Sequence, residues 1–245
     1  GRPNERRRVR TAAARSSRAA PHAAIPAVGN NARFTVNVVT MFARTLRPPR
    51  SAFFLFGPRG TGKSTWVRSS FGGAHVVNLL QPETALRLER EPALLRAQVL
   101  ARPKSGWIVV DEVQRVPRLL DEVHVLMGEH GYRQFVLTGS SARKLKRGAA
   151  NLLAGRAALR TLFPLTAAEL NFSVPASQRL SFGSMPLSVT AADDRAREDY
   201  LRAFVTTYLA EEIRAEGLVR NLGSFSRFLD VAALAAGQAT NVSAI

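Results

Sequence analysis

Residues 57–64 read Gly-Pro-Arg-Gly-Thr-Gly-Lys-Ser and match the pattern GxxxxGK[ST] at every fixed position. Glycines allow backbone angles that turn successive N–H groups inward around phosphate oxygens, and a following helix adds its positive N-terminal end. In this pattern Lys63 reaches the β- and γ-phosphates and the Ser64 hydroxyl ligates Mg²⁺. The sequence therefore predicts a phosphate-binding loop, for which the alternative is an ordinary glycine-rich turn.

A second motif, WIVVDE over residues 107–112, begins 44 residues after Lys63 and delivers a carboxylate to the end of an apolar run. This arrangement matches a Walker B element, in which Asp111 would hold Mg²⁺ directly or through water. The adjacent Glu112 would polarise an attacking water as a general base. A helix-capping or surface carboxylate remains the alternative for Glu112.

Polar and basic residues follow a later apolar run. Thr138 and Ser140, within the segment TGSS, can position the water or sense the γ-phosphate. Capping of the next helix is an equally supported role for them. The basic residues after them are Arg143, Lys144, Lys146, Arg147 and Arg156. They either form a solvated helix face or include an arginine that contacts the γ-phosphate, in the same chain or in a neighbouring one. Among them we favour Arg156 and then Arg143.

Short apolar runs alternate with helical patterns along the segment that carries these motifs. Strands are expected over residues 51–56, 74–80, 107–111, 133–138 and 158–163. Helices are expected over 63–71, 83–90 and 93–101, and on the apolar face that runs from Val116 to Met127. This order predicts an α/β fold with a five-stranded parallel sheet covered by helices on both faces. All the motifs would then meet at the carboxyl edge of the sheet.

The pattern changes after Pro164. Residues 172–192 are rich in Ser, Pro and Ala and are predicted to form a loop. Asp193 and Asp194 can cap a helix that ends at Gly217, and a further helix would run from Ser224 to Gly237. We expect this helical region to be incomplete.

Charge is unevenly distributed along the 245 residues. The net charge is +17, and residues 1–50 alone carry eleven arginines and one acid. Residues 1–31 have no periodic apolar face, so we expect 1–40 to form a disordered basic extension that is dispensable for folding. Three origins stay open for it: a nucleic-acid-binding arm, a transit peptide, or a non-native extension, which we favour.

Composition excludes several classes of protein. No run approaches the about 18 uninterrupted apolar residues of a membrane-spanning helix. The chain has no cysteine, which rules out disulfides, thiolate nucleophiles and zinc–thiolate sites, and its four histidines show no ligand spacing. We therefore expect a soluble protein with a cytoplasmic location.

Six segments occur in an order that resembles a known family. They are FFLFGPRGTGKST, VVDEVQRVPRLLDEVH, FVLTGSSARKL, ANLLAGRA, FPLTAAEL and EDYLRAFVTTYLAEEI. Together they resemble a prokaryotic family of AAA-superfamily P-loop ATPases that carry a C-terminal domain of unknown function. The resemblance covers residues 41–245 and implies an ATP-binding domain over 41–170 followed by a partial helical domain over 171–245. Family members continue past the final TNVSAI segment.

The resemblance also implies the AAA-type strand order, ATP and Mg²⁺ as ligands, and the residues that bind them. Lys63, Glu112 and Arg156 would be catalytic, and Ser64 and Asp111 would hold the metal. The nucleotide would contact Gly57, Pro58, Arg59, Gly60, Thr61, Gly62, Lys63, Ser64, Thr65, Thr138 and Ser140. The function implied is ATP hydrolysis that drives or gates a conformational change. The alternative is a nucleotide-gated binding module with little turnover, with a DNA or protein client that the sequence does not identify.

Overall fold

The computed structural model describes residues 42–140, 145, 153–208 and 221–235, all of which belong to the unit Thr40–Ile245. The predictions for residues 1–40 fall outside these ranges. The strands are β1 (Phe53–Phe56), β2 (His75–Asn78), β3 (Ile108–Asp111), β4 (Phe135–Gly139) and β5 (Ala158–Thr161). The α-helices are α1 (Lys63–Ser70), α2 (Pro82–Arg90), α3 (Ala93–Leu100), α4 (Leu119–Gly128), α6 (Ala176–Phe182), α7 (Pro186–Val189), α8 (Asp194–Thr207) and α10 (Leu222–Leu234). The described residues also form the 3₁₀ helices η1 (Val113–Arg115) and η2 (Leu153–Gly155).

The five strands form one parallel sheet in the order β2-β3-β4-β1-β5. Strand β2, the first after the phosphate loop, lies at an edge, and β3 and β4 separate it from β1. This is the strand order that the family resemblance implies. In the register, Phe56 at the end of β1 pairs with Gly139 at the end of β4, and Asn78 pairs with Asp111. The ends of β1, β3 and β4 therefore share the carboxyl edge, where the sequence placed the motifs.

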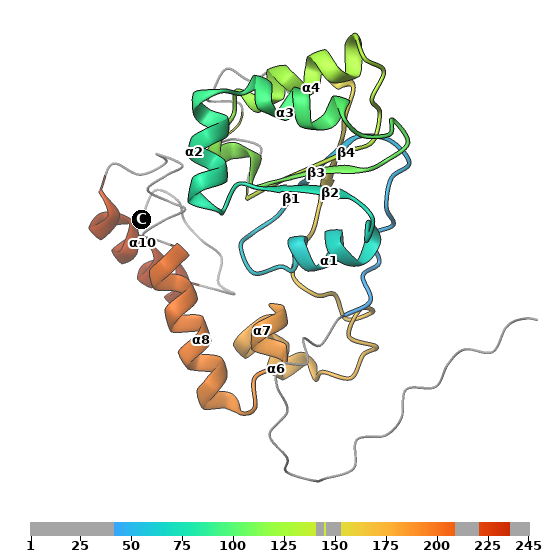
Figure 1. The fold of residues 1–245 in the computed structure, drawn as a ribbon. Coiled ribbons are helices and arrows are strands. Elements are labelled where there is room, and N and C mark those ends of the chain that lie inside the picture. Colours follow the sequence, from blue (N-terminus) through green and yellow to red (C-terminus); the bar gives the residue numbers. More distant parts are fainter. Residues whose placement is uncertain (1–41, 141–144, 146–152, 209–220, 236–245) are drawn as a thin grey trace, which may run out of the picture. The chain divides into compact units, whose positions relative to one another are not determined.

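Helices cover both faces of the sheet, as the alternating pattern predicted. Alternate residues of each strand point to opposite faces, and β1 is buried on both. Phe54 and Phe56 pack in a core with α2, α3 and α4, while Phe53 and Leu55 pack in a second core with α1. Figure 1 shows α1 on one face and α2, α3 and α4 on the other. The phosphate loop thus joins a strand and a helix that two independent cores hold in place.

Two element predictions differ from the structure. Val116 lies outside α4, because η1 and Pro117 come between β3 and the first helical residue, Leu119. The loop expected over 172–192 contains α6 and α7, and this prediction was wrong. Helix α7 begins at Pro186, which fits the first turn of a helix because that turn needs no N–H donor, and Pro175 is the N-cap of α6.

The C-terminal helices begin at side-chain caps. Asp193 caps α8 by accepting a hydrogen bond from the Ala196 N–H at 2.8 Å, as expected. Asn221, rather than Ser224, caps α10 by accepting from the Ser224 N–H at 3.1 Å. The predicted helix ends at Gly217 and Gly237 lie outside the described residues. Within the part of the chain that the structure describes, we find no helix with the length and apolar character needed to cross a membrane.

Candidate nucleotide site

The segment between β1 and α1 is a glycine-hinged loop. Gly57, Gly60 and Gly62 have φ angles of 152°, 81° and 90°, which residues with a side chain rarely adopt. Gly57 also has no room for a side chain, because a Cβ there would lie 2.2 Å from the Leu162 carbonyl oxygen. Gly62 is the N-cap of α1, so the loop ends at a helix N-terminus. Such a terminus presents unpaired N–H groups and the positive end of a dipole to an anion.

The Lys63 ammonium lies inside this loop. Its Nζ donates to the carbonyl oxygens of Gly57 at 2.8 Å and Pro58 at 3.1 Å, and the residue is only 6% exposed. Thr61 is fully buried and donates through its hydroxyl to the Pro58 carbonyl at 2.9 Å. The loop therefore curls around a positive charge, while Pro58, Arg59 and Gly60 remain exposed at its tip.

Hydrogen bonds join the phosphate loop to the ends of β3 and β4. The Ser64 hydroxyl donates to Asp111 Oδ2 at 3.1 Å, 47 positions away in sequence. The Thr138 hydroxyl donates to the other carboxylate oxygen of Asp111 and accepts from the Glu112 N–H at 3.0 Å. The structure thus brings Ser64, Asp111, Glu112 and Thr138 together at one edge of the sheet.

The oxygens of Ser64 and Asp111 suit Mg²⁺. Magnesium prefers hard oxygen ligands and is usually held by one or two carboxylates or hydroxyls together with phosphate oxygens and waters. Asp111 is 7% exposed, and its neighbour Ser64 stands in the first turn of α1, where the phosphates would bind. Among the described residues no group of three His, Cys, Asp or Glu side chains could hold a metal by itself.

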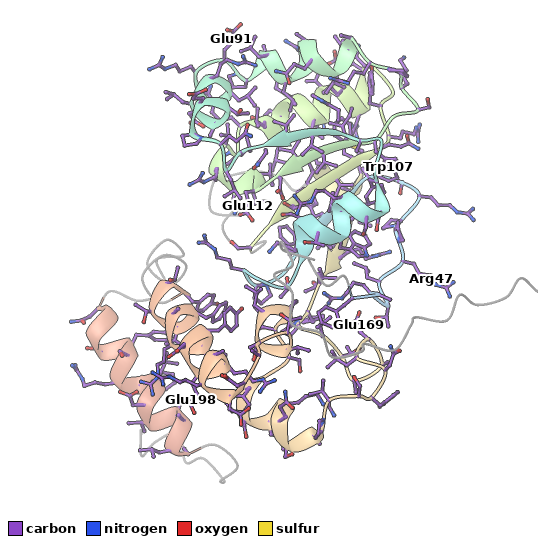
Figure 2. The ribbon with its side chains drawn as sticks, turned by 60° about the horizontal axis from the view of Figure 1, so that its bottom comes forward. Arg47, Glu91, Trp107, Glu112, Glu169 and Glu198 are labelled. Atoms are coloured by element: carbon purple, nitrogen blue, oxygen red, sulfur yellow. The ribbon has the colours of Figure 1, made fainter. Side chains whose placement is uncertain are left out.

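Glu112 stands at the turn that follows β3, and its carboxylate is held by a near neighbour. Its backbone adopts a left-handed conformation, with φ 62° and ψ 47°, at the start of η1. The Gln114 side-chain amide donates a short hydrogen bond to Glu112 Oε2. Figure 2 labels Glu112 and Trp107, which flank β3 at its two ends. Sequence reasoning did not single out Gln114.

The remaining predicted site residues fall into three groups. Thr65 lies half-buried in the first turn of α1. The Ser140 hydroxyl, directly after β4, is buried and has no hydrogen-bond partner within the described part of the chain. Arg143 and the basic residues 144, 146 and 147 lie outside the described residues. Arg156 is described, and its position differs from the expectation.

Arg156 precedes β5, at the amino edge of the sheet. Its guanidinium lies at the end of α4, with Nη1 2.8 Å from the place where a Cβ on Gly128 would be. Phe53, the first residue of β1, pairs with Ala158, whereas Gly57 follows the last residue of β1. The structure therefore places Arg156 at the edge opposite the loop and corrects the expectation that it contacts the γ-phosphate within its own chain. Contact from a neighbouring chain remains a prediction.

A buried ion pair behind the loop was missed by sequence reasoning. Arg44 Nε lies 3.0 Å from Glu169 Oε1, and the two side chains are 7% and 3% exposed. The same guanidinium donates to the Thr61 carbonyl at 2.8 Å and to the Phe163 carbonyl. Glu169 lies in FPLTAAEL as the one charged residue of that apolar segment, and this isolation is the signal that could have revealed it.

Burial raises the pKa of the Glu169 carboxyl, but hydrogen bonds more than offset this effect. The N–H groups of Thr166 at 3.0 Å and Thr45 at 2.8 Å donate to it, as does Arg44. These donors stabilise the carboxylate and hold its pKa below the ordinary value. The charged pair is therefore the stable form at neutral pH.

The tip of the loop also faces the C-terminal helices. A Cβ on Gly60 would lie 3.0 Å from Met185 Cε and 3.2 Å from the Tyr200 hydroxyl of α8. Burial raises the pKa of Tyr200, so its hydroxyl keeps its proton.

Two family models match the chain. A family described as an AAA domain (AAA_14) matches residues 49–171, and a domain of unknown function (DUF8612) matches residues 176–245.

The chain is also similar to curated relatives and to solved structures. Uncharacterized proteins of Mycobacterium bovis and Mycobacterium tuberculosis are each 31% identical over 172 residues, which are 67% of this chain and 36% of theirs. The match therefore spans about a third of the length of these relatives. The Walker-type ATPase of Pyrococcus abyssi is similar with a TM-score of 0.44 and 14% identity, over 66% of this chain and 71% of that one. The ADP form of the Aeropyrum pernix ORC2 protein has a TM-score of 0.37 and 15% identity, over 64% and 62% of the two chains.

Proposed function

Because the chain belongs to the AAA_14 family of AAA domains, we propose that it binds ATP with Mg²⁺ and hydrolyses it to drive or gate a conformational change. The observation that carries the proposal is the 3.1 Å contact between the Ser64 hydroxyl and the Asp111 carboxylate, beside a buried Lys63. A hydroxyl and a carboxylate so placed would share Mg²⁺ with the β- and γ-phosphates.

The nucleotide would lie on the phosphate loop. Backbone N–H groups of residues 59–65 would donate to phosphate oxygens, and the Lys63 ammonium would exchange its two carbonyl partners for the β- and γ-phosphates. Thr138 and Ser140 would face the γ-phosphate from the end of β4. The sequence has no Asn-Lys-x-Asp motif of the kind that selects guanine, which favours ATP.

In the hydrolysis step Glu112 acts as general base. Its carboxylate accepts one proton from a water whose oxygen forms a bond to the γ-phosphorus. The bond from that phosphorus to the bridging oxygen breaks, and the electron pair leaves with ADP. Lys63 holds positive charge where negative charge develops on the phosphate oxygens. Bound Mg²⁺ would supply further charge neutralisation there.

The test compares Glu112→Gln with the matched surface variant Glu91→Gln. Glu91 is exposed beyond the end of α2 (Figure 2). We expect Glu112→Gln to bind ATP with the affinity of the unchanged chain. Its rate of phosphate release should fall by about 10²-fold or more, because the base is removed. Glu91→Gln should release phosphate at the rate of the unchanged chain.

Two outcomes would count against hydrolysis. ATP binding without phosphate release in the unchanged chain would favour the nucleotide-gated module instead. Phosphate release that survives in Glu112→Gln would remove the base from the proposal.

A further inference from the structure

We propose that Gln114 is a positioning residue for hydrolysis, which holds the attacking water together with Glu112. This inference rests on the proposed function. The amide nitrogen of Gln114 orients the Glu112 carboxylate, and its carbonyl oxygen accepts a hydrogen bond from the water.

The first observation is the direct contact between the two side chains. The backbone turns at Glu112, directly after β3, and Gln114 follows in η1. Gln114 Nε2 then donates a hydrogen bond to Glu112 Oε2. This contact fixes the orientation of the amide, because the reverse orientation would put two acceptor oxygens against each other. The carbonyl end of the amide therefore points away from the carboxylate.

The second observation is that this carbonyl oxygen has no partner. Gln114 Oε1 is buried from solvent and accepts no hydrogen bond from the residues that the structure describes, although Glu112 and Gln114 themselves are only half-buried. A buried acceptor without a donor is unfavourable, and such atoms in folded proteins are commonly satisfied by a water or ligand. The structure thus holds an acceptor in place for a donor that arrives from outside the chain.

The third observation is where that oxygen lies. A Cβ on Gly139 would be 2.6 Å from Gln114 Oε1 and 3.5 Å from the Phe56 ring. Gly139 and Phe56 are paired ends of β4 and β1, and Phe56 leads directly into Gly57 of the phosphate loop. The unpartnered acceptor therefore lies at the carboxyl edge of the sheet, beside the paired ends of β4 and β1, and β1 leads into the phosphate loop.

Two groups could approach Gln114 Oε1, an oxygen of the γ-phosphate or a water, and their hydrogen-bonding chemistry favours water. The oxygens of a γ-phosphate are acceptors and have no proton to donate to Gln114 Oε1 at neutral pH. A water has two protons, so it can donate one to Glu112 and the other to Gln114 while a lone pair faces the phosphorus. Glu112 takes the first proton as the bond to phosphorus forms, and the second stays on the oxygen and leaves with the phosphate.

This arrangement also accounts for a glycine that no turn requires. Gly139 lies within β4 and has an ordinary extended backbone, so its small size is needed for space rather than for conformation. An alanine there would push the Gln114 amide away. Gly139→Ala is therefore a second, independent way to displace Gln114 without altering its chemistry.

The experiment uses the full chain with Gln114→Ala, Gln114→Glu and Gly139→Ala. Gln134→Ala is the matched control, because Gln134 is also half-buried with an unpartnered Oε1 but precedes β4, at the opposite edge of the sheet. Each variant is assayed for kcat and KM with ATP. Each is also titrated with ADP plus beryllium fluoride, which mimics bound ATP, and with ADP plus aluminium fluoride, which mimics the γ-phosphate with the water in line.

We expect the three variants to lower kcat by about 10-fold or more at a KM within about 3-fold, as a lost transition-state contact does. Their affinity for the aluminium fluoride complex should fall by a similar factor, while that for the beryllium fluoride complex stays unchanged. Gln134→Ala should change neither quantity. Gln114→Ala in the Glu112→Gln background should have no further effect on turnover, because the two act on one water.

Two results would overturn the inference. Unchanged turnover in Gln114→Ala, or equal weakening of both fluoride complexes, would assign Gln114 a structural role alone and leave the proposed function standing. An unchanged chain that binds ATP but neither releases phosphate nor prefers the aluminium fluoride complex would overturn the inference and the hydrolysis proposal together.

Discussion

Arg44 and Glu169 lie 125 positions apart, and their side chains form an ion pair of 3.0 Å that is almost fully buried. The pair joins the segment before β1 to the segment after β5, and through the Thr61 carbonyl it also supports the phosphate loop. It therefore ties the stability of the fold to the shape of the candidate site.

The first prediction concerns the stability that this pair provides. Glu169→Gln should lower the free energy of unfolding by about 3 kcal/mol, because breaking a buried pair leaves an uncompensated charge on Arg44. Urea unfolding of the full chain measures this value. The control is Asp194→Asn, which breaks the ion pair between Asp194 and Arg197. The Asp194 side chain is 71% exposed, so this pair should contribute less than about 1 kcal/mol to the free energy of unfolding. Equal losses in the two variants would contradict the assignment.

The second prediction concerns pH. The pKa of Glu169 is lower in the folded chain than its ordinary value of 4.5, so the folded state favours the charged form. Its contribution to stability is complete above the ordinary value and is lost as the pH falls through the lower, folded value. The stability difference between the unchanged chain and Glu169→Gln should therefore shrink below pH 4.5. A difference that stays constant from neutral pH to that acid range would disprove the linkage.

The third prediction concerns the lysine in the loop. Lys63→Ala should weaken ATP binding by about 100-fold or more, because each charged hydrogen bond to a phosphate contributes about 1.5–3 kcal/mol. Equilibrium titration with a fluorescent ATP analogue measures the affinity. Lys104→Ala is the control, since Lys104 is an exposed lysine that lies over the Tyr132 ring. Unchanged binding in Lys63→Ala would show that the loop does not bind phosphate.

The fourth prediction concerns the basic N-terminal residues, 1–40. A chain that starts at Met41 should fold and bind ATP as the full chain does, because the described contacts of the loop involve residues from Arg44 onward. If residues 1–40 bind nucleic acid, the full chain alone should be retained on DNA, with a steep dependence on salt. A shortened chain that fails to fold or to bind ATP would contradict the prediction.

The sequence predicted those parts of the fold that depend on local pattern. The run of apolar residues before Gly57, the glycines and the helix that begins at Lys63 are all encoded within about 20 positions. The meeting of Ser64 with Asp111 also follows from the motifs, since parallel strands bring their carboxyl ends to one edge. Nothing local marks Arg44 as the partner of Glu169, because that pairing depends on how the chain closes around the sheet.

Arg156 and Gln114 show two further limits. Arg156 was assigned by its motif alone, but it precedes a strand, and the residues before parallel strands gather at the edge away from the site. Gln114 could not be identified because its role depends on the left-handed turn at Glu112 and on the space left by Gly139. Helices α6 and α7 were missed because they have only seven and four residues, too few for an apolar period to emerge.

The close approach of Leu162 to Gly57 has a consequence for reading related sequences. Leu162 directly follows edge strand β5, and its carbonyl oxygen would lie 2.2 Å from a Cβ on Gly57, so any larger residue there would force the backbone to shift, whether or not a nucleotide is ever bound. A descendant that had given up ATP would still keep this glycine. The presence of Gly57 in a related sequence is therefore not by itself evidence of nucleotide binding.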